Sequence, residues 1–149
     1  MRFKAAMDEL VAAMGMPSVT SDDSGAFSLL FDDKFEISFS PDGEDDSVVF
    51  HADVSDASEL AEGVCRSLLE QSLLGAKTGG ASFSIDPTAK RVVIWKRYRD
   101  FADCGELERA LEQFLGQVVF WMDRLSNGAF SAAETVEPPP MQAGAFMKV

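Results

Sequence analysis

The sequence predicts an α+β fold, in which a twisted, mostly antiparallel sheet packs against helices. Helical and alternating hydrophobic patterns occupy separate segments, which follow one another in the order α-β-β-β-α-β-β-α. The links between neighbouring strand segments are short and rich in turn residues. The 149 residues suit a single domain, which we expect over residues 1–126, with a flexible tail over residues 127–149.

The first expected helix covers roughly residues 2–14. Apolar residues recur there at helical spacing, and they are Phe3, Met7, Leu10 and Met14. Gly15 follows in a position typical of a C-cap, and Pro17 prevents the helix from continuing.

Three short strands are expected next, over residues 26–31, 35–40 and 47–54. In the second of them apolar and polar residues alternate, which predicts one face toward the core and one toward water. Turn residues at 32–34 and 41–46 separate the three strands. The segment therefore predicts an antiparallel meander.

A second helix is expected after these strands. Asp56 and Glu59 have the spacing of a capping box just before an apolar run, and we expect Gly75 to end the helix. The apolar arc is wide, because two adjacent stripes contribute to it: Leu60, Val64 and Leu68 on one, Leu69 and Leu73 on the other. One side of this helix can cover the sheet, and the other side calls for a further partner.

A hairpin and a long third helix complete the expected fold. Strands at 81–85 and 91–98 flank a turn at 86–90, and four successive apolar residues at 92–95 indicate that both faces of the second strand need cover. Asp103 and Glu106 again have capping-box spacing. The stripe of the third helix consists of Leu107, Leu111, Phe114, Val118, Met122 (or Trp121) and Leu125, and Gly128 ends it.

Residues 75–80, GAKTGG, look at first like a phosphate-binding loop. A P-loop needs a lysine directly after a glycine and opens a helix, whereas here Lys77 follows an alanine and a helix precedes the loop. Phosphate binds at the positive, N-terminal end of a helix, and this loop sits at the negative end. We therefore expect a helix stop, with Gly75 in a left-handed conformation and the two later glycines reversing the chain.

The composition argues against several classes of function. The formal net charge of −12 repels nucleic acid, and no apolar run approaches the roughly 20 residues that span a bilayer. His51 is the only histidine, and Cys65 and Cys104 lie far apart in the sequence. We therefore expect a cytoplasmic protein with no catalytic residues, no cofactor, no metal site, no nucleic-acid partner and no membrane insertion.

Three segments carry a resemblance to a known family: ELAEGVCRSLLEQSLLGAKTGGASFSID, RVVIWKRY and LERALEQFLGQVVFWMDRL. Together with the N-terminal MGMP and FSLLFDDKFEISF, they make the chain resemble the class I type III secretion chaperones over roughly residues 2–126. The resemblance implies a non-enzymatic, cytoplasmic homodimer that uses no ATP itself. Such a chaperone binds the N-terminal region of a secreted effector in extended form, keeps it competent for secretion and delivers it to the secretion apparatus.

The resemblance also implies two sets of contact residues. The client contacts fall on the first helix and the sheet: Met7, Leu10, Met14, Met16, Phe27, Leu29, Phe31, Phe35 and Ile37. The dimer contacts fall on the second helix and a later strand: Val64, Leu68, Leu69, Leu73, Val93 and Trp95. Methionines adapt to irregular apolar partners, and an edge strand at 26–31 could accept a client strand. For any one of these residues a place in the core is the open alternative.

Two other classes of function stay open. One is an interaction or regulatory protein on the same fold, without a client effector. The other is a small enzyme, which would require a deep polar pocket with converging carboxylates, whereas the sequence offers one histidine and scattered acids.

Overall fold

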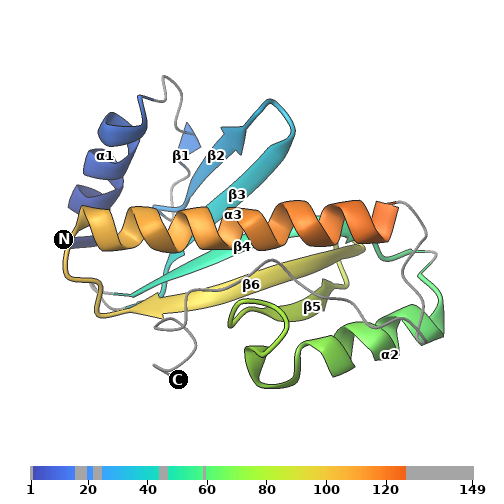
Figure 1. Cartoon of the computed structure of the whole chain (residues 1–149). Coiled ribbons are helices and arrows are strands. Elements are labelled where there is room, and N and C mark those ends of the chain that lie inside the picture. The colour runs from blue at the N-terminus through green and yellow to red at the C-terminus, as the bar shows by residue number, and fades with distance from the viewer. Residues whose placement is uncertain (1, 16–19, 22–24, 44–46, 59, 127–149) are drawn as a thin grey trace.

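The computed structural model describes residues 2–15, 20–21, 25–43, 47–58 and 60–126 (Figure 1). Met16, Glu59 and the expected tail lie outside the described residues. The elements are α1 (Arg2–Met14), β1 (Thr20–Ser21), β2 (Phe27–Phe31), β3 (Phe35–Pro41), β4 (Ser47–Asp56), α2 (Glu62–Gln71), the 3₁₀ turn η1 (Leu73–Gly75), β5 (Ser82–Asp86), β6 (Arg91–Arg99) and α3 (Cys104–Ser126).

The strands form one six-stranded sheet in the order β1-β2-β3-β4-β6-β5, and every neighbouring pair is antiparallel. The long helix α3 crosses one face of this sheet, α1 lies beside its N-terminal end, and α2 lies beyond β5 (Figure 1). This arrangement confirms the predicted α+β class, the antiparallel meander and the hairpin.

The register decides which side chains face the helices. Phe39 lies opposite Phe50, and Ala52 lies opposite Ile94, so the even-numbered residues of β4 and β6 share one face with the odd-numbered residues of β2 and β3. All four of these side chains are buried. The opposite face carries the alternate residues, and it is mostly polar on β2 and β3.

The helix α3 supplies much of the core. Its apolar stripe packs on β3 and β4, with Phe114 in edge-to-face contact with Phe50 at 5.7 Å between ring centroids. Of the two residues proposed for the last full turn, Trp121 is fully buried and Met122 is only half-buried. Capping is as predicted, because the Glu106 amide donates to Asp103 Oδ1 at 2.8 Å.

The predicted start of α2 is wrong. The helix begins at Glu62, after Ala61 as its N-cap and without a side-chain cap. Asp56 is instead the last residue of β4, where it pairs with Arg91. Its carboxylate accepts hydrogen bonds from the Ser58 amide at 2.8 Å and the Ser58 hydroxyl at 2.6 Å, so the same side-chain chemistry closes a turn rather than a helix end.

Two further boundaries differ from expectation. The helix α2 ends at Gln71 rather than at Gly75, and the turn η1 follows it. Residues Thr20–Ser21, where no strand was expected, form β1 and pair with Ser28 and Phe27 of β2. The strand β2 is therefore paired on both sides at its start, so part of the edge expected there is covered.

Candidate interaction surfaces

The first candidate surface is a ridge of exposed leucines, here called the α2 ridge: Leu69 on α2, and Leu73 and Leu74 on η1. Their side chains are 69%, 69% and 84% exposed. Three adjacent exposed leucines are a common mark of an interaction site. Leu69 and Leu73 were expected on a dimer contact from the sequence, and Leu74, which lies between Leu73 and Gly75, was missed.

An apolar cavity of about 230 Å³ opens beside the α2 ridge. It lies between α2 and the hairpin, and it is lined by Cys65, Leu68, Leu69, Phe83, Ser84, Ile85 and Val92. Leu68 is buried against the core at its base, whereas Ile85 is 52% exposed at its rim. The lining offers few polar groups, so the cavity suits an aliphatic side chain better than water or a charged ligand.

The loop 75–80 fixes the ridge in place. Gly75 and Gly80 both have positive φ, +71° and +85°, and the Gly80 amide donates to the Gly75 carbonyl at 2.9 Å. The Thr78 hydroxyl donates to the Ala81 carbonyl at 2.5 Å inside the same turn. The loop follows α2 and η1 and leads into β5, and Gly75 has the left-handed conformation that the sequence predicts.

A lysine from the sheet secures this loop from the other side. Lys96 Nζ donates to the Gly79 carbonyl at 3.0 Å and lies 5.6 Å from the centroid of the Tyr98 ring. Burial lowers the pKa of Lys96, because removal from water disfavours the ammonium form. A lysine in this position anchors the backbone of the loop to the sheet.

The expected client residues divide into two groups. Four are fully buried in the core, namely Met7, Leu10, Leu29 and Ile37. In this structure none of these four side chains is exposed to contact a partner. The half-buried members are Met14, Phe27, Phe31 and Phe35, here called the aromatic patch. Phe27 pairs with Phe39 and Phe31 with Phe35 on the helix-facing side of β2 and β3.

A groove of about 380 Å³ adjoins the aromatic patch. Phe35 forms one wall with Lys34, and the last turns of α3 form the other with Phe120 and Met122. Val119, 39% exposed, lies at its edge. This groove was not expected from the sequence, because it depends on how the β2–β3 turn sits against α3.

The expected dimer residues do not form one surface. Leu68 is buried and Val64 half-buried on the helix side, whereas Val93 and Trp95 lie on the opposite face of β6. There the Trp95 indole donates to Ser84 Oγ at 2.8 Å, and Arg97 lies 5.8 Å from the Trp95 ring centroid. Of the six expected dimer residues, only Leu69 and Leu73 have largely exposed side chains that lie near each other.

His51 occupies the same open face of the sheet. Its Nε2 lies 3.3 Å from Ser40 Oγ, and it pairs across the sheet with Trp95. Burial lowers the pKa of His51, and the nearby Asp53 carboxylate opposes that shift. His51 is therefore a half-buried residue of β4.

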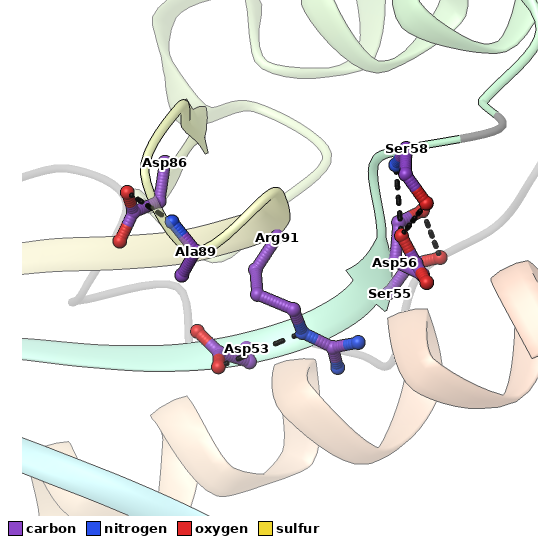
Figure 2. Close-up of polar contacts among 7 residues, drawn as sticks. All are labelled: Asp53, Ser55, Asp56, Ser58, Asp86, Ala89 and Arg91. Atoms are coloured by element: carbon purple, nitrogen blue, oxygen red, sulfur yellow. Dashed lines mark hydrogen bonds and ion pairs between the residues drawn. The ribbon is translucent and has the colours of Figure 1, made fainter.

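Carboxylates gather at one end of β4 and β6 without converging on a common point (Figure 2). Asp53 faces Arg91 at 3.6 Å, and Asp56 turns toward Ser58. Asp86 accepts from the backbone amide of Ala89 at 3.1 Å. Among the described residues no group of three or more His, Cys, Asp or Glu side chains could hold a metal ion. In the same part of the chain no helix is long and apolar enough to cross a membrane.

Comparison with known proteins gives a consistent match. The model of the Tir chaperone protein (CesT) family matches residues 5–122. Among curated proteins no significant match was found. Among solved structures, a chain of the ExsC-ExsE complex is 22% identical with a TM-score of 0.70, and the match covers 90% of this chain and 100% of that one.

Two further solved structures share the fold. A chain of the HopA1-SchA chaperone-effector complex is 16% identical with a TM-score of 0.67, over 81% of this chain and 93% of that chain. A chain of the heterodimeric ExoU-SpcU complex from the type III secretion system of Pseudomonas aeruginosa is 20% identical with a TM-score of 0.61, over 81% of this chain and 95% of that chain.

Proposed function

This chain belongs to the Tir chaperone protein (CesT) family, and from that premise we propose that it is a chaperone for a type III secretion effector. In this proposal it binds the N-terminal region of the effector in extended form, keeps that region competent for secretion and delivers it to the secretion apparatus. The observation that carries the proposal is the family match over residues 5–122. The resemblance to HopA1-SchA, a chaperone-effector complex, supports it.

We assign client binding to the aromatic patch and its groove. The patch offers aromatic and methionine side chains that are only half-buried, and such side chains adapt to varied apolar segments. The side chains of a bound client segment could enter the groove, between Phe35 on one side and Phe120 and Met122 on the other.

We also propose that the protein acts as a cytoplasmic homodimer and performs no catalysis. The α2 ridge supplies an apolar surface on the opposite end of the molecule from the aromatic patch (Figure 1). Separate surfaces allow a client and a second copy to bind at the same time. The carboxylates of Figure 2 each have their own partner, which supports an interaction protein rather than a hydrolase.

A two-variant experiment tests this assignment. The effector is first identified by mass spectrometry of what co-purifies with the protein from its native host, and its N-terminal fragment and its remainder are then prepared separately. Calorimetry should show binding of the N-terminal fragment alone. Phe27→Asp should weaken that binding and leave the dimer intact, whereas Leu69→Asp should weaken the dimer, because the dimer would bury an unpaired charge.

Leu30→Asp is the matched control for Phe27→Asp. Leu30 lies on the same strand, is 50% exposed and faces the other side of the sheet, so its substitution should leave client affinity unchanged. Equal losses of affinity in the two variants would remove the aromatic patch from the client site. A protein that binds no effector fragment would favour the alternative, a regulatory member of the same fold without a client.

A further inference from the structure

The groove beside the aromatic patch follows one face of α3 to the end of that helix. Val119, Met122 and Ser126 of its lining are spaced by three and four residues, so they share one face of the helix. Ser126 is also the last residue of α3. The chain therefore leaves the helix at one end of the groove.

The walls of this groove are apolar and only partly covered. Phe35 and Met122 are half-buried, and Val119 is 39% exposed. Lys34 Nζ lies 5.3 Å from the centroid of the Phe35 ring, so the methylene groups of this lysine extend the apolar wall. Because these surfaces are in contact with water, an apolar side chain that enters the groove is stabilised by removing them from it.

The sequence that follows α3 offers such a side chain within reach. Residues 127–149 continue from Ser126, and Phe130, four positions on, is their first large apolar side chain. Gly128 lies between them, and glycine is the residue type that most often lets a chain turn after a helix. Four extended residues span about 13 Å, and Val119 lies about 10 Å back along the helix axis from Ser126. Phe130 can therefore reach the whole groove.

We propose that residues 127–130 turn back along α3 in the client-free protein, with Phe130 in the groove, and that a client displaces them. The inference rests on the proposed client site and specifies what fills its groove when no client is bound. The tether favours this segment over a second copy, because a short link gives an effective concentration on the order of millimolar. A client then binds only to the fraction of the protein in which the groove is open, which raises its apparent dissociation constant.

The methyl group of Met122 reports on the groove without any client. Met122 lines the groove, so an aromatic ring bound there shifts its NMR signal. In the full-length chain with isotope-labelled methionine methyl groups, Met122→Leu identifies this signal. Phe130→Ala should move it, whereas Phe146→Ala, the matched control from the same segment, should not. An unmoved signal in Phe130→Ala would overturn the inference. A signal that instead moves only with protein concentration would place a second copy in the groove and overturn it as well.

Client affinity is the second measurement. Calorimetry with the N-terminal effector fragment should give a dissociation constant about 10-fold lower for Phe130→Ala than for the wild type, which corresponds to a groove filled about nine-tenths of the time. Phe146→Ala should match the wild type. Equal affinities in all three proteins would overturn the displacement while leaving the client site intact. If none of them binds the fragment, the proposed function and the displacement fall together, and the Met122 signal alone decides whether Phe130 fills the groove.

Discussion

The loop that carries the α2 ridge depends on one glycine, and Gly75→Ala tests that dependence. Gly75 has φ +71°, and a Cβ built on it would lie 2.6 Å from the Gly80 Cα. The left-handed conformation costs a residue with a Cβ roughly 1–2 kcal/mol. The close neighbour is backbone, so the turn must open and lose the Gly80–Gly75 hydrogen bond, which contributes about 1 kcal/mol. We expect a total loss of about 2–3 kcal/mol in the free energy of unfolding.

Two other glycines separate these contributions. Gly15 has φ +64° and nothing within 4 Å of its Cβ position, so Gly15→Ala should lose only the conformational part, about 1 kcal/mol. Gly63 lies inside α2 with nothing within 4 Å of its Cβ position. Gly63→Ala should therefore stabilise the protein by about 0.5–1 kcal/mol.

Urea unfolding followed by circular dichroism gives the free energy of unfolding of each variant and of the wild type. All four are measured at one fixed protein concentration, because dimerisation contributes to apparent stability. From most to least stable, the order should be Gly63→Ala, wild type, Gly15→Ala and Gly75→Ala. If Gly75→Ala loses no more free energy of unfolding than Gly15→Ala, the argument from the close approach of Gly75 and Gly80 is refuted. The dimer of Gly75→Ala should also be weaker, because the ridge leucines would move with the turn.

Three further substitutions have clear expected outcomes. Burial lowers the pKa of His51 below 6.5 in the folded protein, so the unfolded chain takes up the proton first as the pH falls. The contribution of His51 to the free energy of unfolding is therefore fully present above pH 6.5 and declines below it. Urea unfolding at pH 7.5 and at pH 5.5 should give a smaller difference in this free energy for His51→Gln than for the wild type. Thr78→Val keeps the shape of a fully buried side chain but removes its hydrogen bond to the Ala81 carbonyl, and thermal unfolding should show a loss of about 1–3 kcal/mol. Asp103→Ala removes the cap of α3 and should lose about 1 kcal/mol in the same assay, with Asp103→Asn close to wild type.

Elements whose sequence pattern continues over many residues were predictable from the sequence. The helix α3 was identified because its cap and its stripe agree over many turns, and both are present in the structure. The start of α2 was not, because a short acidic side chain that accepts a nearby amide looks the same in sequence whether it caps a helix or closes a turn. The pairing of Asp56 with Arg91 across the sheet decides between the two.

Burial was the least predictable property of the candidate surfaces. Met7 and Phe27 are both apolar residues on amphipathic elements, yet one is fully buried and the other half-buried. The difference arises from where α1 and α3 lie on the sheet, which no local pattern encodes. Leu74 was missed for the same reason, since its exposure follows from a turn whose shape is set by the glycines that come after it.

The order of the strands also has a consequence for how the chain acquires its fold. The meander β2-β3-β4 is local, whereas β4 and β6 pair Ser47 with Arg99 and Asp56 with Arg91, and α2, η1 and β5 lie in the segment between them. Bringing β4 and β6 together closes that segment into a loop, and the chain entropy is lost before the hydrogen bonds between the two strands form. During synthesis the meander can therefore form early, with the Phe50 side of β4 uncovered until β6 and α3 arrive. The end of the molecule that carries the proposed client patch would be shaped first, and the end that carries the proposed dimer contact would follow.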